Sequence, residues 1–293
     1  MDPSLIPEPL KVPQLLRQHQ LYPRKSLGQN FLIDNNALEK VVNAGEISNL
    51  DNVLEIGAGL GSLTRFLARA ANRVIAVELD DHLMPILKMV LEPEKNVELV
   101  YGDILKLDPA QLMKEDGYLV VANIPYYITS AIIRHLLASP QKPRRMVLTI
   151  QKEVAQRICA KPGDLSLLAL SVQIFGEPKI VATIAAGAFY PPPKVDSSVI
   201  RIDLFKEPII PSENLDIFFR LAKAGFGQKR KMLRKSLSAG LSWNVEKTVD
   251  LLLSCNIDPT RRAETLNLTE WKKLTEVYLS TSGVSALEIE ETA

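Results

Sequence analysis

The stretch "NVLEIGAGLGSLT", residues 52 to 64, decides the fold class of this chain. Its apolar start, Val53 to Ile56, is typical of a buried strand, and "SLTRFLARA" behind it has the apolar spacing of a helix. Gly57, Gly59 and Gly61 join the two. Glycines at the head of a helix permit a tight turn and let the backbone approach a ligand. We therefore predict a ligand-binding turn here, with a plain strand-to-helix turn as the alternative.

The same alternation of short apolar runs with helical stretches continues beyond this turn. The strand-like runs are "NVLEIG", "RVIAVEL", "VELVYGD", "YLVVANI" and "RMVLTIQ", and amphipathic stretches such as "HLMPILKMVL" and "SAIIRHLLA" separate most of them. Strands that alternate with helices at this spacing predict βαβ units and a parallel sheet covered on both faces. The predicted fold class is α/β, doubly wound, with "PKIVATIA" and "SSVIRIDLF" as an antiparallel pair that closes the sheet.

Composition shifts divide the chain into five parts. Residues 1–20 contain four prolines and predict a loosely structured extension, and 21–205 form the large α/β domain. Residues 206–213, "KEPIIPSE", are the predicted linker because they carry two prolines and little periodicity. Four helical segments in 214–280 predict a small all-helical second domain, and 281–293 read as a frayed tail.

Composition also narrows the class of protein. The chain has 293 residues, of which 46% are hydrophobic, and this is ordinary for a folded protein with one large core. Cys159 and Cys255 have no CxxC or Cys/His companion, so neither a disulfide framework nor a zinc or other metal site is predicted. We find no signal peptide and no apolar run long enough to span a bilayer, and we expect a cytoplasmic protein without membrane contact.

Positive charge is concentrated in one window of a chain whose formal net charge is only +1. No Asp or Glu occurs between Ile217 and Val245, and the basic residues there are Arg220, Lys223, Lys229, Arg230, Lys231, Arg234 and Lys235. Such a window is the electrostatic footprint expected of contact with a polyanion. A solvated helix face is the alternative.

Two acidic residues follow the next two predicted strands. Glu78 ends "RVIAVE" and Asp103 ends "VYGD", so both carboxylates are expected at the same edge of the sheet as the glycine turn. A dinucleotide fingerprint would have its third glycine where Ser62 stands, which argues against a nicotinamide dehydrogenase. The spacing instead favours a nucleoside with an amino-acid tail, such as S-adenosylmethionine. Each acid taken singly could instead be a helix N-cap.

A fourth predicted strand ends in the tetrapeptide Asn123-Ile124-Pro125-Tyr126. Pro125 has no backbone donor and restricts Ile124, so this corner is stiff. The Asn123 side-chain oxygen and the Ile124 carbonyl can accept hydrogen bonds from an exocyclic amine, and Tyr126 can stack on a base. The corner therefore predicts a ligand-binding site rather than an ordinary loop.

"NIPY" resembles the motif of methyltransferases that act on the exocyclic nitrogen of adenine. With "RKSLGQNFLID" (24–34), "FYPPPKVDSSV" (189–199) and "GFGQKRKMLRKSL" (225–237), the chain from about Tyr22 to Leu279 resembles the small-subunit ribosomal RNA adenine dimethyltransferases, the KsgA or RsmA family. The resemblance implies a class I (Rossmann-like) S-adenosylmethionine-dependent methyltransferase domain and a small helical domain. It also implies an enzyme that dimethylates two adjacent adenosines in a hairpin near the 3′ end of 16S rRNA, in an immature small subunit. We expect this enzyme to be a monomer.

The resemblance also implies roles for individual residues. Catalytic roles fall on Asn123, Ile124, Pro125, Tyr126 and Phe189, with Tyr126 and Phe189 on either side of the target adenine. The implied cofactor-binding residues are Asn30, Leu32, Gly57, Gly59, Glu78, Asp103 and Asn123, and the implied RNA-binding residues are Lys229, Arg230, Lys231, Arg234 and Lys235. Tyr126 and Phe189 could also be ordinary core aromatics, and Asn30 a helix cap, although Asp34 or Asn35 suits that position better.

Two other functions share many of these features. A resistance-type methylase of 23S rRNA shares "NIPY" and the glycine turn, but "SLGQNFLID" and the basic "GFGQKRKMLRKSL" resemble the small-subunit branch. A non-catalytic ribosome-assembly factor could keep the fold and the RNA surface, but it would not need the acceptors at Asn123 to Tyr126. Two departures from the family pattern remain: Ala58 stands where relatives often have proline, and 161–173 lacks a Tyr-Gly that relatives often carry.

Overall fold

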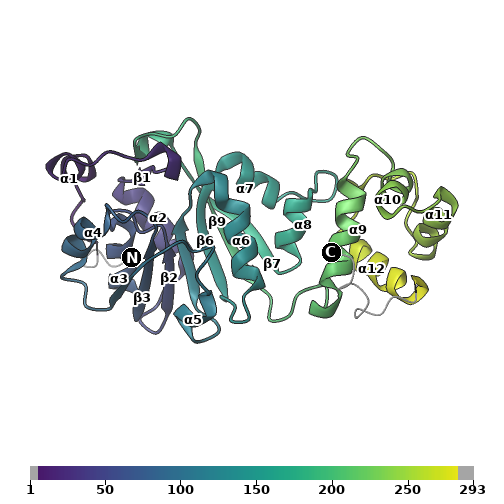
Figure 1. Ribbon diagram of the computed structural model, residues 1–293, viewed down its shortest axis with the longest axis horizontal. Helices are drawn as coiled ribbons and strands as arrows, with labels where there is room; N and C mark the ends of the chain where they lie inside the picture. Colours follow the sequence, from purple (N-terminus) through teal and green to yellow (C-terminus); the bar gives the residue numbers. More distant parts are fainter. Residues whose placement is uncertain (1–5, 283–293) are drawn as a thin grey trace. The chain divides into compact units, whose positions relative to one another are not determined.

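The computed structural model describes residues 6–282, which form two compact units (Figure 1). Unit 1 comprises residues up to 156 together with 177–204, and unit 2 comprises 157–176 together with the residues from 205 onward. The sequence analysis assigned all of 21–205 to one domain, whereas the structure groups 157–176 with the helical unit. Backbone hydrogen bonds explain the difference, because the Phe205 N–H donates to Phe175 and the Gly163 N–H to Glu264, both at 2.9 Å.

Unit 1 is built on a seven-stranded sheet whose order is β4-β3-β2-β5-β6-β9-β7. Neighbouring strands from β4 to β6 run parallel, and β9 is antiparallel to β6. The two strands that were expected to close the sheet, β9 and β7, are neighbours at its end. The strands are β2 (Asn52–Ile56), β3 (Arg73–Glu78), β4 (Val97–Tyr101), β5 (Leu119–Asn123), β6 (Arg145–Gln151), β7 (Gly176–Ile184) and β9 (Ser197–Leu204). The predicted α/β doubly wound class is confirmed.

Helices of unit 1 pack against this sheet in the pattern expected of βαβ units. They are α2 (Asn35–Gly45), α3 (Ser62–Ala70), α4 (Met84–Leu91), α5 (Pro109–Met113), α6 (Thr129–Ala138) and α7 (Lys152–Ile158), with short 3₁₀ turns at Lys25–Leu27, Tyr126–Ile128 and Ala186–Ala188. Helix α2 contacts β5, β6 and β9, whereas α3 contacts β3. Asp34 caps α2 by accepting a 2.8 Å hydrogen bond from the Ala37 N–H, as preferred over Asn30.

The prediction of a loosely structured extension over residues 1–20 was wrong for residues 12–18. These form helix α1 (Val12–Gln18), with Pro13 in its first turn, where the missing N–H of proline costs no hydrogen bond. Val12 and Leu16 lie one turn apart and are buried. They pack in one cluster with Phe31, Leu60, Leu83 and Ile86. Pro13 therefore stands at the beginning of a docked helix.

Two short segments pair outside the main sheet. Strand β1 (Phe31–Leu32) is antiparallel to β8 (Phe189–Tyr190), and Leu32 lies opposite Phe189. Both side chains are only 3% exposed and belong to the main hydrophobic cluster of unit 1. This pairing connects the segment that precedes β2 with the segment that precedes β9.

Unit 2 consists of helices packed around a buried tryptophan. Its helices are α8 (Leu167–Gln173), α9 (Leu215–Phe226), α10 (Leu233–Leu241), α11 (Val245–Ser254) and α12 (Leu268–Ser282), with 3₁₀ turns at Ser212–Asn214 and Ala263–Thr265. Trp271 stacks on Phe226 with ring centroids 5.9 Å apart and meets the edge of Phe218. A Cβ atom at Gly240 would lie 2.5 Å from the Ala224 Cβ, so α10 reaches α9 only because residue 240 is glycine.

The end of the described chain agrees with a local sequence pattern. Asn267 and Glu270 have the spacing of a capping box, and each donates its backbone N–H to the other's side chain, at 2.8 and 2.9 Å. Helix α12 continues through residue 282, so most of the predicted tail, 283–293, lies outside the described residues. Among residues 6–282, no helix combines the length and apolar character needed to cross a membrane.

Candidate active site

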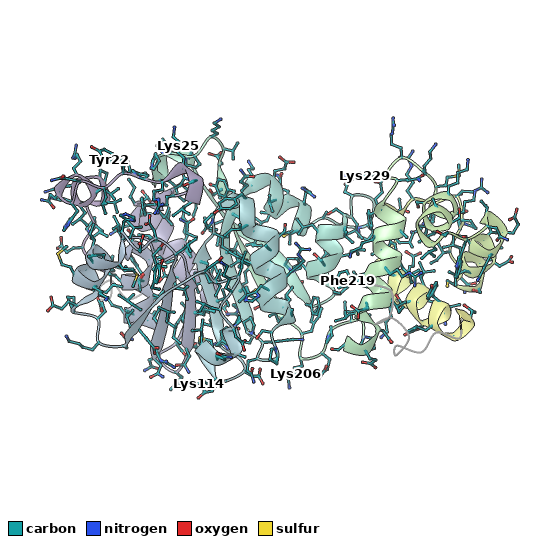
Figure 2. The ribbon with its side chains drawn as sticks, in the orientation of Figure 1. Tyr22, Lys25, Lys114, Lys206, Phe219 and Lys229 are labelled. Atoms are coloured by element: carbon teal, nitrogen blue, oxygen red, sulfur yellow. The ribbon has the colours of Figure 1, made fainter. Side chains whose placement is uncertain are left out.

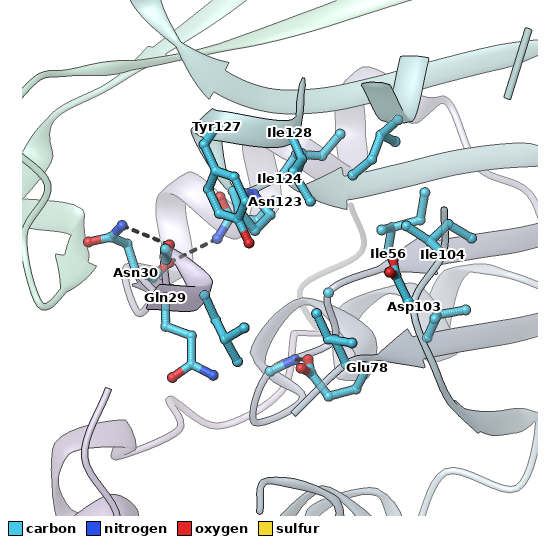
Figure 3. Close-up of a pocket in the computed structure, with 18 of the residues that line it drawn as sticks. Gln29, Asn30, Ile56, Glu78, Asp103, Ile104, Asn123, Ile124, Tyr127 and Ile128 are labelled. Carbon is cyan, nitrogen blue, oxygen red and sulfur yellow. Dashed lines mark hydrogen bonds between the residues drawn. The ribbon is translucent and has the colours of Figure 1, made fainter. Parts of the chain in front are cut away.

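One cavity of unit 1 lies at the carboxyl ends of β2, β3, β4 and β5 (Figure 3). In an open parallel sheet this edge is the usual place for a ligand. The cavity gathers nine of the residues that the sequence singled out: Asn30, Gly57, Gly59, Glu78, Asp103, Asn123, Ile124, Pro125 and Tyr126. They come from five separate segments of the chain, and the sheet brings them together.

The glycine turn after β2 has the backbone geometry that its sequence requires. Gly57 has φ +78° and Gly59 has φ +60°, both in the left-handed region that favours glycine. A Cβ atom at Gly59 would lie 3.0 Å from the Phe31 ring, so a side chain there would also collide with the wall of the cavity. Helix α3 then begins at Ser62, the residue that departs from a dinucleotide fingerprint.

Glu78 at the end of β3 is almost fully buried and accepts two backbone hydrogen bonds. Its Oε2 accepts the Gly59 N–H at 2.6 Å, and its Oε1 accepts the Asp80 N–H at 2.8 Å. Burial raises the pKa of this carboxyl above its usual range, although these backbone donors oppose the shift. The carboxylate therefore holds the glycine turn in place and presents its remaining lone pairs to the cavity.

Asp103 follows β4 and lies on the same side of the cavity as Glu78 (Figure 3). Its Oδ1 accepts the Leu105 N–H at 3.0 Å, and its carbonyl accepts from Lys106 and Leu107. Apolar side chains, including Ile56, Val77, Leu79 and Ile104, line the space near the two acids. Two carboxylates beside an apolar wall suit a ligand that has a flat ring, hydroxyl groups and an amine. The carboxylate oxygens can accept hydrogen bonds from the hydroxyl and amine groups, and the apolar wall can contact the ring.

The Asn123-Ile124-Pro125-Tyr126 corner forms another wall of the cavity. Asn123 Nδ2 donates to the Asn30 carbonyl at 3.0 Å, and the Ile124 N–H donates to the Thr149 carbonyl at 3.2 Å. The Tyr126 hydroxyl is 2.7 Å from Ser197 Oγ, and burial raises the pKa of this phenol. Side chain and backbone are therefore fixed at this corner by contacts with three other segments.

The structure does not bring Leu32 and Phe189 to this cavity. Both side chains are buried in the core of unit 1, where they face each other in the β1–β8 pair. The predicted sandwich of a target base between Tyr126 and Phe189 is therefore not formed here, because the Phe189 ring packs into the core. Tyr126 alone of the two aromatics lines the cavity.

Sequence reasoning missed several residues of the cavity wall. Leu27, Gly28 and Gln29 line it just before Asn30, and Tyr127 lines it just after Tyr126. Tyr127 is 62% exposed, and a Cβ atom at Gly28 would lie 3.2 Å from its ring. The sequence signal that could have identified them is their position, since Leu27, Gly28 and Gln29 lie within "SLGQNF" and Tyr127 directly follows "NIPY".

The predicted RNA-binding residues lie in unit 2, and Lys229 extends outward from the segment between α9 and α10 (Figure 2). Lys229, Arg230, Lys231 and Lys235 are exposed, and Arg234 is half-buried. The ion pairs that residues 205–282 form with described carboxylates use Arg261 and Arg262. The five predicted cations are thus not neutralised by ion pairs within the described chain.

Comparisons with known proteins identify relatives of this chain. The family model described as ribosomal RNA adenine dimethylase matches residues 21–276. The ribosomal RNA small subunit methyltransferase A of Dehalococcoides mccartyi strain CBDB1 is 45% identical over 266 residues, which cover 90% of this chain and 91% of that protein.

Two solved structures are similar to most of this chain. A dimethyladenosine transferase from Plasmodium falciparum has a TM-score of 0.75 and 27% identity, and the match covers 87% of this chain and 98% of that one. The 23S rRNA methyltransferase ErmE has a TM-score of 0.68 and 27% identity, and the match covers 85% of this chain and 99% of that one.

Proposed function

This chain belongs to the ribosomal RNA adenine dimethylase family, and on that premise we propose that it dimethylates N6 of adenosines in small-subunit ribosomal RNA. The observation that carries the proposal is the fixed Asn123–Asn30 contact at the edge of the cavity. It orients an amide acceptor in the same cavity as the two carboxylates that suit a nucleoside. The 45% identity to a small-subunit methyltransferase favours this substrate over large-subunit RNA.

The cavity fits S-adenosyl-L-methionine, which when bound supplies a methyl group on a positively charged sulfur. Glu78 and Asp103 offer carboxylate oxygens to ribose hydroxyls and to an adenine amine, and the apolar wall suits the ring between them. The turn at Gly57 and Gly59 leaves room for the backbone to approach the amino-acid end. We propose that these four residues and Asn30 hold the cofactor.

Asn123 and Ile124 act on the amine that receives the methyl group. The lone pair of an adenine amine is delocalised into the ring, which makes the nitrogen a weak nucleophile. The Asn123 Oδ1 and the Ile124 carbonyl accept its two N–H groups and draw the lone pair out of conjugation. As the new N–C bond forms, positive charge develops on the nitrogen, and the same two oxygens stabilise it from positions set before the reaction begins. The nitrogen then releases one N–H proton to water, which leaves the methylated amine neutral.

Tyr126 holds the target base against this corner. Its hydroxyl is anchored on Ser197, so the ring is fixed as a stacking platform. A base must leave its stack to reach such a platform, which favours a hairpin or single-stranded target over a regular duplex. Phe189 would have to leave the core to stack on the other face of that base, and we therefore assign the stacking role to Tyr126 alone.

Unit 2 supplies the contact with RNA phosphates. The exposed Lys229, Arg230, Lys231 and Lys235, with Arg234 beside them, are placed to bind phosphates, which position an RNA more than they specify its sequence. The finer assignment is to two adjacent adenosines near the 3′ end of 16S rRNA in an immature small subunit. We propose a cytoplasmic monomer without a metal, since one chain supplies the whole cavity and a neutral thioether leaves without metal assistance.

The test uses two reactions, each with the purified protein and labelled S-adenosyl-L-methionine. One reaction contains undermethylated small ribosomal subunits and the other contains undermethylated large subunits. Mass spectrometry of the digested RNA then locates the label. N6,N6-dimethyladenosine confined to the small subunit is the expected result. Label only in the large subunit would make the chain a 23S rRNA methylase, and subunit binding without any label would make it an assembly factor.

A further inference from the structure

A buried carboxylate next to the cavity has no role in the proposed reaction. Asp80 is 2% exposed and follows Glu78 by two residues, yet it does not line the cavity. Its Oδ1 accepts from Arg24 Nη1 at 3.0 Å and from the His82 N–H at 3.2 Å, and its Oδ2 accepts from Gln29 Nε2 at 2.7 Å. Two of these donors come from one loop, more than fifty residues earlier in the chain.

That loop, residues 24–30, contributes residues 27–30 to the cavity wall. Gln29 closes it on itself, because its Oε1 accepts the Arg24 N–H at 2.8 Å while its Nε2 reaches Asp80. The next residue, Asn30, offers its carbonyl to Asn123. Asp80 is therefore connected to Asn123 by two hydrogen bonds and the peptide bond that joins Gln29 to Asn30.

The backbone of Asp80 is also connected to the glycine turn, through Glu78. Its backbone N–H donates to Glu78 Oε1, and the second oxygen of Glu78 accepts the Gly59 N–H. We propose that Asp80 is a positioning residue that latches loop 24–30 over the cofactor cavity and so keeps the cavity in its binding-competent form. This inference rests on the proposed function, because it assigns the latch to the same cofactor site.

The electrostatics of Asp80 fit a latch better than a metal site. Asp80, Asp81 and His82 have possible metal-binding atoms within 4.8 Å of one another. The Arg24 guanidinium, however, already lies 3.0 Å from Asp80 and 3.4 Å from His82 Nδ1, where it would repel a cation. Burial pushes the pKa of Asp80 up, but hydrogen bonds from Gln29 and Arg24 outweigh burial and hold the pKa below its usual range.

Donor and acceptor types at this latch permit a test by polarity. The Arg24 N–H can only donate and the Asp80 carboxylate can only accept, so the orientation of the Gln29 amide is fixed between them. In Asp80→Asn, the new amide nitrogen can replace Oδ2, and it then faces the Gln29 amide nitrogen. If the new side chain turns, its nitrogen faces Arg24 Nη1 instead, and if Gln29 turns, its amide nitrogen faces the Arg24 N–H. Adding Gln29→Glu removes the conflict, because the new carboxylate at position 29 can accept from both the Arg24 N–H and the new amide at position 80.

The first measurement is amide hydrogen exchange of residues 24–31 in the free protein, with no ligand present. Asp80→Asn should speed exchange in this loop, and Asp80→Asn/Gln29→Glu should restore protection. The matched control is Asp81→Asn, because Asp81 is the next residue in the chain and its carboxylate is 63% exposed. This variant should behave as the wild type. Gln29→Met removes both bonds of the amide and leaves Asp80 paired with Arg24, so it tests the latch even if Asp80→Asn does not fold.

The second measurement separates cofactor affinity from turnover. Calorimetry with S-adenosyl-L-homocysteine should show binding about tenfold weaker in Asp80→Asn, the scale of one lost charge-assisted hydrogen bond. At saturating S-adenosyl-L-methionine, kcat should change by less than about threefold, since bound ligand draws the loop closed. The double variant should regain most of the affinity.

Each contrary outcome has a separate meaning. Unchanged exchange and affinity in both Asp80→Asn and Gln29→Met would overturn the latch. A double variant as weak as Asp80→Asn would also overturn it, because the effect would then not depend on pairing between residues 29 and 80. Wild-type protein that bound no cofactor would instead remove the proposed function, while the exchange experiment would still decide whether Asp80 holds the loop.

Discussion

Asn123 donates its side-chain amide to the backbone carbonyl of Asn30 at 3.0 Å, across 93 residues of chain. A carbonyl can only accept, so this contact decides which end of the Asn123 amide carries the nitrogen. The oxygen is left for a ligand in the cavity. Figure 3 shows the contact beside Ile124 and Tyr127, where a target amine would arrive.

Removal of this amide should abolish most of the chemistry while binding is retained. Asn123→Ala is expected to lower the single-turnover rate by about 100- to 1,000-fold, the usual loss when one preorganised transition-state contact is removed. Asn123→Asp should be similarly slow, because a carboxylate cannot donate to the Asn30 carbonyl. Filter binding of small subunits should stay within about twofold of wild type. Equal losses of rate and of RNA binding would contradict the assigned role.

The hydroxyl and the ring of Tyr126 should contribute separately. Tyr126→Phe keeps the stacking surface and loses only the 2.7 Å contact with Ser197, so we expect the rate to fall by less than about fivefold. Ser197→Ala should have the same effect. Tyr126→Ala removes the platform and should cost about 10- to 100-fold, given the usual energy of base stacking on an aromatic ring. These rates are measured with saturating cofactor, and three equal values would exclude a stacking role.

Cations of the α9–α10 segment should control the salt dependence of RNA binding. The triple variant Lys229→Ala/Arg230→Ala/Lys231→Ala should lower the slope of log K against log [salt] by about 2 to 3, one phosphate contact for each lost cation. The matched control is Lys88→Ala/Lys95→Ala/Lys114→Ala, which removes exposed lysines of unit 1. If both triple variants shift the slope equally, the effect reports net charge rather than a binding surface.

A buried acid in β2 should make stability depend on pH. Burial is the main cause that raises the pKa of Glu55 to about 8, and its Oε2 has no hydrogen-bond partner among the described residues. The folded protein therefore holds a proton that the unfolded chain has released above pH 4.5, so this group destabilises the fold increasingly from pH 4.5 to about 8.

Glu55→Gln should remove that dependence. Denaturant unfolding of Glu55→Gln and of wild type should differ by about 2 to 3 kcal/mol more at pH 9 than at pH 6, with the variant favoured at the higher pH. Glu115→Gln, at an exposed position, is the control and should show no such change. A constant difference across this range would mean that Glu55 is ionised in the folded protein at pH 6.

The large sheet could be predicted because its signals are local. Buried parallel strands are continuous apolar runs, as in Val120 to Ala122, and strand ends carry the residues that a shared edge brings together. The glycine turn, Glu78, Asp103 and Asn123 each stand at such an end, so their convergence followed from topology alone. The Asp34 cap and the Asn267–Glu270 capping box are likewise set by neighbours within three residues.

Other features depended on partners far away in sequence. Helix α1 forms because Val12 and Leu16 dock on Leu60, Leu83 and Ile86, whereas the four prolines of residues 1–20 gave the opposite local signal. Phe189 was expected at a base, but its side chain lies opposite Leu32 in the core, a choice that only the β1–β8 register makes visible. Asp80 is similar, since its donors stand more than fifty residues earlier.

The close contact of Gly240 with Ala224 has a thermodynamic consequence for the proposed contact with RNA. It brings α9 and α10 together and so anchors both ends of the short connection that carries Lys229 to Lys231. Much of the backbone freedom of that connection is lost when the helices pack, before any RNA is met. Association then forfeits less conformational entropy than it would with a free basic tail, where each ordered residue costs about 1 to 2 kcal/mol.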